Sequence, residues 1–148
     1  GCVALNVITT SNSLVTLGDS AFANCSSLTD IAFSDNLKSV GAKAFSGCGS
    51  LRNISLGNGV NSIKGEAFKQ CASLETVMLP ESVTELGNRA FEECVGLTKI
   101  VIPNAITKIL AVLKILNMPC RQWQPKAATG LCWNRAESAV ISYTREKA

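Results

Sequence analysis

Hydrophobic positions recur along the first part of the chain with a period of 23 residues. Four copies of Ala-Phe-x-x-Cys begin at Ala21, Ala44, Ala67 and Ala90. With each cysteine as position zero, large apolar residues recur at three, six, twelve and fifteen residues, and at eight residues in all but the first copy. Almost none of these columns contains a charged residue. The pattern therefore predicts repeated coils that share one buried side.

A coil of this length cannot bury its own apolar side, so identical coils must stack on one another. Each column then becomes a continuous internal row, with rungs about 4.8 Å apart. Such spacing suits offset stacking of aromatic rings. We therefore expect Phe22, Phe45, Phe68 and Phe91 to form one interior row. A parallel row of cysteines should accompany it.

Each coil is expected to contain three kinds of local structure. Residues 29 to 33 and their equivalents alternate inward and outward, which predicts a short parallel strand. The segment through Leu37 and Val40 is predicted to be extended or turning. A glycine then precedes Ala-Phe-x-x-Cys, whose inward positions fit about one helical turn.

The fragment "LETVMLPESVTELGNRAFEEC" (74–94) resembles the 23-residue BspA-type (Treponema pallidum-type) leucine-rich repeat, and the similarity covers roughly residues 2–109. Ser34 and Gly57 depart from it, because proline is usual at both positions. The resemblance implies a right-handed repeat solenoid with short parallel strands on its concave face. It also implies proteins that are often bacterial or protist surface molecules and bind other proteins.

The repeat ends near Ile109, which predicts two regions: a solenoid of about five repeats over 1–109, the first truncated, and a different segment over 110–148. The second region is expected to be helical and to cap the last coil. One helix would use Ile106, Ile109, Leu110, Leu113 and Leu116, and a second, capped by Asn134 and Glu137, would use Trp133, Ala136, Val140 and Tyr143. The alternative is a poorly ordered tail or a gene-model error.

Charge supports this division without pointing to nucleic acid. Residues 1–103 carry seven Lys/Arg and nine Asp/Glu, whereas the remainder carries seven Lys/Arg and two Asp/Glu. These basic residues are too dispersed to form a nucleic-acid site. The longest apolar run, residues 105–118, is too short for a membrane span and contains two lysines. Neither nucleic acid nor a membrane span is therefore expected.

The compartment stays open, because there is no initiating Met and no signal peptide, and Gly1 falls within the pattern. We expect a piece of a longer or processed protein. The sequence leaves the oligomeric state open, and a monomer is expected. The family resemblance favours a cell-surface or extracellular location.

The chain has seven cysteines but no histidine and no Cys-x-x-Cys. Five cysteines lie 23 residues apart, and sulfurs in a line cannot form the tetrahedral shell that zinc prefers. We therefore expect buried thiols and neither a metal nor a cofactor. Cys120 and Cys132 lie outside the repeat, and their pairing is left open. Without histidine or a nucleophile motif, we expect no enzyme activity.

The outward strand positions vary in chemistry, as a recognition surface allows. From them we predict partner-binding residues Asp30, Asn53, Ser55, Thr76, Met78, Lys99 and Val101. The predicted function is a protein-interaction or adhesion module that uses the concave strand face and edge loops. The alternatives are a structural or regulatory spacer in a larger protein and attachment to a membrane surface through residues 105–118.

Overall fold

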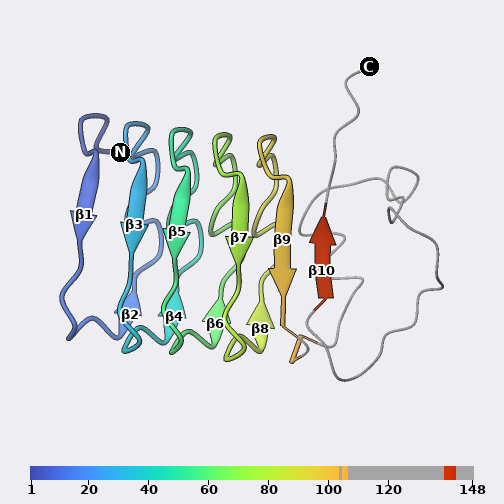
Figure 1. Ribbon diagram of the computed structural model, residues 1–148. Helices are drawn as coiled ribbons and strands as arrows, with labels where there is room; N and C mark the ends of the chain where they lie inside the picture. The colour runs from blue at the N-terminus through green and yellow to red at the C-terminus, as the bar shows by residue number, and fades with distance from the viewer. Residues whose placement is uncertain (104, 107–138, 143–148) are drawn as a thin grey trace, which may run out of the picture.

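The computed structural model describes residues 1–103, 105–106 and 139–142. The chain winds into coils stacked side by side, and each coil contributes a strand to two rows (Figure 1). The first row contains β1 (Val7–Thr9), β3 (Asp30–Ala32), β5 (Asn53–Ser55), β7 (Thr76–Met78) and β9 (Lys99–Ile102). The second row contains β2 (Thr16–Leu17), β4 (Ser39–Val40), β6 (Ser62–Ile63) and β8 (Glu85–Leu86).

The register of both rows follows the 23-residue period. Ile8 lies opposite Ile31, which in turn lies opposite Ile54, and the strands are parallel. The second row is one continuous four-stranded sheet. In the first row β5 and β7 are neighbours (Figure 1), but they belong to separate hydrogen-bonded sheets. The predicted solenoid of parallel coils is therefore confirmed.

The Ala-Phe-x-x-Cys segments form successive tight turns, so the prediction of a helical turn there was wrong. In the first of them, alternate N–H groups close turns within the coil and the others reach the next coil. Phe22 N–H, for example, donates to Ala44 O at 2.8 Å, whereas Cys25 N–H donates to Phe22 O at 3.2 Å. Ser20 and Asn24 adopt positive φ values of 55° and 59°. A helix would satisfy these N–H groups internally and leave the next coil unpaired.

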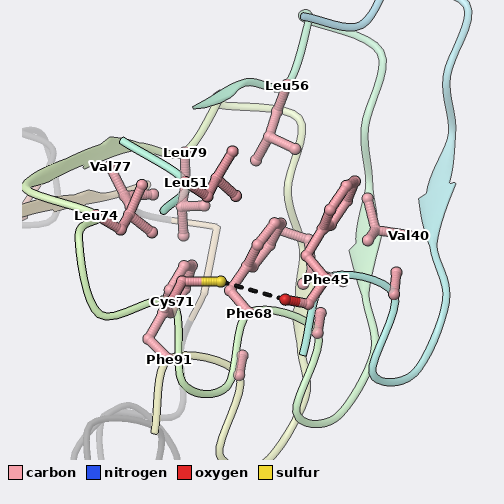
Figure 2. Packing of buried hydrophobic residues seen from close by; sticks show 14 of the residues in the cluster. Val40, Phe45, Leu51, Leu56, Phe68, Cys71, Leu74, Val77, Leu79 and Phe91 are labelled. Carbon is pink, nitrogen blue, oxygen red and sulfur yellow. Dashed lines mark hydrogen bonds between the residues drawn. The ribbon is translucent and has the colours of Figure 1, made fainter. Parts of the chain in front are cut away.

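The core is the continuous set of rows that the period predicted. Phe22, Phe45, Phe68 and Phe91 form one file, with successive ring centroids 5.5, 5.3 and 5.2 Å apart. The last three rings are buried, as Figure 2 shows for the central coils. Phe22 is half-buried because it lies near the first coil. The leucine, isoleucine and valine columns surround this file.

The cysteine row satisfies backbone carbonyls of the phenylalanine file. Three of the thiols donate to the phenylalanine carbonyl of the preceding coil: Cys48 to Phe22 at 3.1 Å, Cys71 to Phe45 at 3.3 Å and Cys94 to Phe68 at 3.0 Å. Figure 2 shows the central one of these bonds. Cysteine is small and apolar enough for the core and still supplies a weak donor. Its recurrence is therefore a consequence of coil stacking.

The end of the solenoid is closed by a strand where a helical cap was predicted. Residues Ala139–Ser142 form β10, which pairs antiparallel with β9 (Figure 1). An edge strand presents unpaired N–H and C=O groups, which another strand can satisfy and an amphipathic helix cannot. Val140 therefore lies in a strand, not in the predicted second helix. The other predicted helical residues lie outside the described residues, apart from Ile106, which is buried.

Removing one ring from the middle of the file should be costly. We expect Phe68→Ala to lower the free energy of unfolding by about 3–5 kcal/mol, because the cavity would lie between two buried rings. Phe22→Ala should cost clearly less, since Phe22 is half-buried and has one stacked neighbour in the file. Urea denaturation of both variants measures the difference. Equal losses would contradict a continuous interior file.

Stability should fall in alkaline solution as the buried thiols ionise. Burial raises the pKa of Cys48 from 9.0 to about 11. Because the folded state disfavours the thiolate, this contribution is complete below about pH 9 and is lost as the pH rises toward 11. Urea denaturation across this range should show a shallower decline for Cys48→Ala than for the unsubstituted chain. Parallel declines would show that Cys48 is not responsible.

Candidate functional site

The exposed side of the first strand row is the principal candidate site, here called the strand face. It consists of two columns of outward residues. The first contains Val7, Asp30, Asn53, Thr76 and Lys99, and the second contains Thr9, Ala32, Ser55, Met78 and Val101. All of them are exposed except Val101, which is half-buried. The structure thus brings all seven predicted partner-binding residues onto one face.

The alternation of the strands produces this face. In β3 and β7 the central residues, Ile31 and Val77, point into the core, so their neighbours on both sides must point outward. The inward residues stay apolar because they fill the shared core. The outward residues carry no such requirement and differ from coil to coil.

Among the described residues, Asp30 and Asn53 form the one direct hydrogen bond between side chains of this face. Asn53 Nδ2 donates to Asp30 Oδ1 at 2.6 Å. This bond lowers the pKa of Asp30, with smaller contributions from Thr29 and the positive charge of Arg52. The carboxylate therefore stays ionised to lower pH than an ordinary aspartate, and its orientation is held by the next coil.

The other end of the face combines an apolar side chain with a positive charge. Met78 is 68% exposed and lies opposite Val101. Methionine adapts to differently shaped partners and is frequent at binding surfaces. Within the described residues, the Lys99 side chain makes no ion pair or hydrogen bond. The face thus offers a fixed carboxylate, hydroxyl groups, an apolar contact and a cation.

A second charged surface, which sequence reasoning missed, lies on the turns that contain Ala-Phe-x-x-Cys. Ion pairs link Lys43 to Glu66 at 3.9 Å, Glu66 to Lys69 at 3.8 Å, Lys69 to Glu92 at 2.7 Å and Glu92 to Arg89 at 3.8 Å. The signal was present in one column, where Lys43, Glu66 and Arg89 alternate in sign. These charges pair with one another, so this turn surface has fewer groups available to a partner.

The paired charges of the turn surface have shifted pKa values. The Lys69 ammonium lowers the pKa of Glu92, and the Glu92 carboxylate raises the pKa of Lys69. On the second strand row, Glu85 accepts a hydrogen bond from the Ser62 hydroxyl at 2.7 Å and one from Lys64 at 3.1 Å. Both partners, the hydroxyl first, lower the pKa of Glu85. These shifts follow from contacts between coils and do not require a catalytic role.

The cysteine row does not form a metal or disulfide site in the described part of the chain. Cys2, Cys25, Cys48, Cys71 and Cys94 are all free. No group of three or more Cys, His, Asp or Glu side chains among the described residues could hold a metal ion. Cys120 and Cys132 lie outside the described residues, so their pairing stays open. Among the described residues, no helix has the length and apolar character of a membrane span.

Removing the Asn53 amide should raise the pKa of Asp30 toward that of an ordinary aspartate, because the carboxylate loses its main hydrogen-bond donor. Titration of Asn53→Ala by NMR of the Asp30 side-chain carboxyl measures this change. Asn36→Ala is the matched control, since the Asn36 amide also bonds across coils, to Asn12 O at 2.7 Å, but away from Asp30. An unchanged Asp30 pKa in Asn53→Ala would contradict the assigned cause.

Comparison with known proteins places this geometry in context. The sequence matches the BspA type Leucine rich repeat region family in six copies over residues 1–112. The cysteine register predicted about five repeats over residues 1–109. The family match gives six copies and reaches residue 112. No curated protein is significantly similar to the chain.

Solved structures of similar fold include several from bacteria. A leucine-rich repeat protein from Bacteroides ovatus is 36% identical over 71% of this chain and 27% of its own length, with a TM-score of 0.68. A leucine rich cell surface protein from Faecalibacterium prausnitzii is 33% identical over 70% of this chain and 28% of its own, with a TM-score of 0.65.

The pneumococcal vaccine antigen PcpA is 26% identical over 68% of this chain and 25% of its own length, with a TM-score of 0.65. This chain thus spans about a quarter of the length of these three structures. The match across six repeat copies, together with the stacked coils and their phenylalanine file, leads to one conclusion. The chain belongs to the BspA-type leucine-rich repeat family.

Proposed function

We propose that the chain is a non-catalytic module for protein interaction or adhesion, which binds its partner through the strand face and the edge loops. The observation that carries this proposal is the difference between the two sides of each strand. Inward residues repeat the same apolar types in every coil, whereas the outward column runs from Asp30 through Asn53 and Thr76 to Lys99. A rigid scaffold thus carries varied, exposed chemistry, as recognition requires.

The comparisons favour a surface location for such a module. One similar structure is named a cell surface protein and another a vaccine antigen. An extracellular or cell-surface location is therefore part of this proposal. The partner would be a protein, and the chain itself would act as a monomer.

The size of the strand face limits how tightly it can bind alone. Five rungs about 4.8 Å apart and strands of mostly three residues, about 10 Å long, give a face of roughly 240 Å². A stable complex typically buries about 800 Å² on each partner. A tight complex would therefore need further coils or the loops that border the strands.

A structural or regulatory spacer is the second candidate. The continuous core and the ion pairs between coils would suit a stiff connector as well as a binding scaffold. The varied outward columns favour the binding module, because a spacer does not require a carboxylate, hydroxyl groups, an apolar side chain and a cation on one exposed face.

Replacing Asp30, Asn53, Thr76 and Lys99 together by alanine should abolish capture of a protein partner by the immobilised chain. The four side chains are exposed, so the free energy of unfolding should change little, and urea denaturation checks this. Pull-down from cell-surface extracts, followed by quantification of the captured protein, measures the loss.

A second quadruple variant provides the control. Lys43, Glu66, Gln70 and Glu93 lie on the turn surface, and their replacement by alanine should leave capture unchanged. Loss of capture in both variants would point away from the strand face. Absence of any captured partner with the unsubstituted chain would favour the spacer.

A further inference from the structure

The loop between β5 and β6 contains the pair Asn58-Gly59. An asparagine side chain can be attacked by the backbone nitrogen of the residue that follows it. Glycine has no Cβ to shield this nitrogen, and its backbone reaches more conformations than that of any other residue. Asn58 is the only asparagine in the chain that precedes a glycine.

The structure leaves both reacting groups available. The Asn58 side chain is exposed and makes no hydrogen bond within the described residues. The N–H of Gly59 likewise has no hydrogen-bond acceptor among those residues. Asn53 differs, because its amide is held by Asp30 at 2.6 Å. Asn36 differs in the same way, because its amide donates to Asn12 O at 2.7 Å.

The backbone on the other side of Asn58 is held in place. Its N–H donates to Asp35 Oδ1 of the preceding coil at 2.6 Å. Gly57, one residue earlier, has a φ of +62° and packs against the Ser34 carbonyl. The loop is therefore anchored before Asn58, while the Asn58 side chain is exposed and the Gly59 N–H is not engaged in a hydrogen bond with the described residues.

We propose that Asn58 is a site of spontaneous deamidation in the folded chain. The Gly59 nitrogen loses its proton to solvent and forms a bond with Cγ of Asn58. The Cγ–Nδ2 bond then breaks, Nδ2 takes up a proton from solvent, and ammonia leaves. The product is a five-membered succinimide that joins Asn58 and Gly59.

Water opens this ring in one of two ways. Addition at Cγ breaks the bond from Cγ to nitrogen and gives aspartate with the normal backbone. Addition at the backbone carbonyl carbon breaks the original peptide bond and gives isoaspartate, in which the chain continues through the former side chain. No oxidant or reductant is needed, and both products carry a new carboxylate.

The modification should weaken stacking of this coil on its neighbour. Gly59 packs so closely against the preceding coil that a Cβ on it would overlap the Asp35 carbonyl oxygen. Isoaspartate adds a methylene to the backbone next to this contact. The equivalent positions in the flanking coils are Asp35 and Glu81, so the new carboxylate also falls between two acidic rungs. Solenoid stability depends on each interface between neighbouring coils.

The test is to incubate the intact chain at mildly alkaline pH and body temperature and to follow tryptic fragments by mass spectrometry. Cleavage after Arg52 and Lys64 places Asn53, Asn58 and Asn61 in one fragment, so the three can be compared directly. We expect Asn58 to be modified clearly faster than the other two, because glycine alone leaves the attacking nitrogen without a neighbouring Cβ.

A urea-denatured sample shows whether the fold permits the reaction. Comparable modification of Asn58 in folded and denatured chain supports the proposal. Modification confined to the denatured chain, or equal rates at Asn53 and Asn58 in the folded chain, overturns it.

Two variants separate the chemical step from its consequence. Asn58→Gln should abolish the modification, since its longer side chain would have to close a larger ring. Asn58→Asp introduces the charge without the extra backbone methylene, so its urea midpoint should fall less than that of the isoaspartate fraction of aged chain. An isoaspartate fraction with the midpoint of fresh chain would overturn the proposed effect on stacking.

Discussion

Hydrogen bonding between successive coils is the constraint on which the rest of this structure depends. In the first row, strands of neighbouring coils are hydrogen-bonded to each other, except β5 and β7. In the turns, alternate N–H groups donate to carbonyls of the next coil. A buried backbone group without a partner is costly, so each coil needs its neighbour at one distance and in one register. The 23-residue period expresses this requirement.

The side chains of the core follow from that register. Because equivalent residues lie directly over one another, a phenylalanine at one position faces a phenylalanine in the next coil, and the rings stack 5.2 to 5.5 Å apart. The cysteine thiols then reach phenylalanine carbonyls of the preceding coil. Neither row requires a metal, a disulfide or a catalytic purpose. Both result from repeating one coil on a fixed spacing.

The same stacking leaves the surfaces free to differ. On the turn surface, charges alternate between coils and pair with one another, which adds to the match between neighbours. On the strand face, Lys99 and Met78 remain directed to solvent, while Asp30 is held by a single amide. This difference makes the strand face the better candidate for recognition. It also shows why the loops matter: contacts such as Gly59 against Asp35 couple surface positions to coil stacking.

The sequence by itself determined the features that depend on repetition. The strand positions, the inward and outward columns, the phenylalanine file and the family could all be predicted, because a strict period means that each coil has the same environment. The predicted partner-binding residues share one face for the same reason, although their role in binding stays a proposal.

Only the tertiary structure decided the features that depend on contacts between coils. The Ala-Phe-x-x-Cys segments look helical by spacing, but their N–H groups are needed by the next coil, so they form turns. The ion pairs from Lys43 to Arg89 required knowing which side chains from different coils meet. The strand at Ala139–Ser142 likewise forms because the edge of β9 has N–H and C=O groups that another strand can satisfy. The local pattern of apolar residues contains no information about this edge.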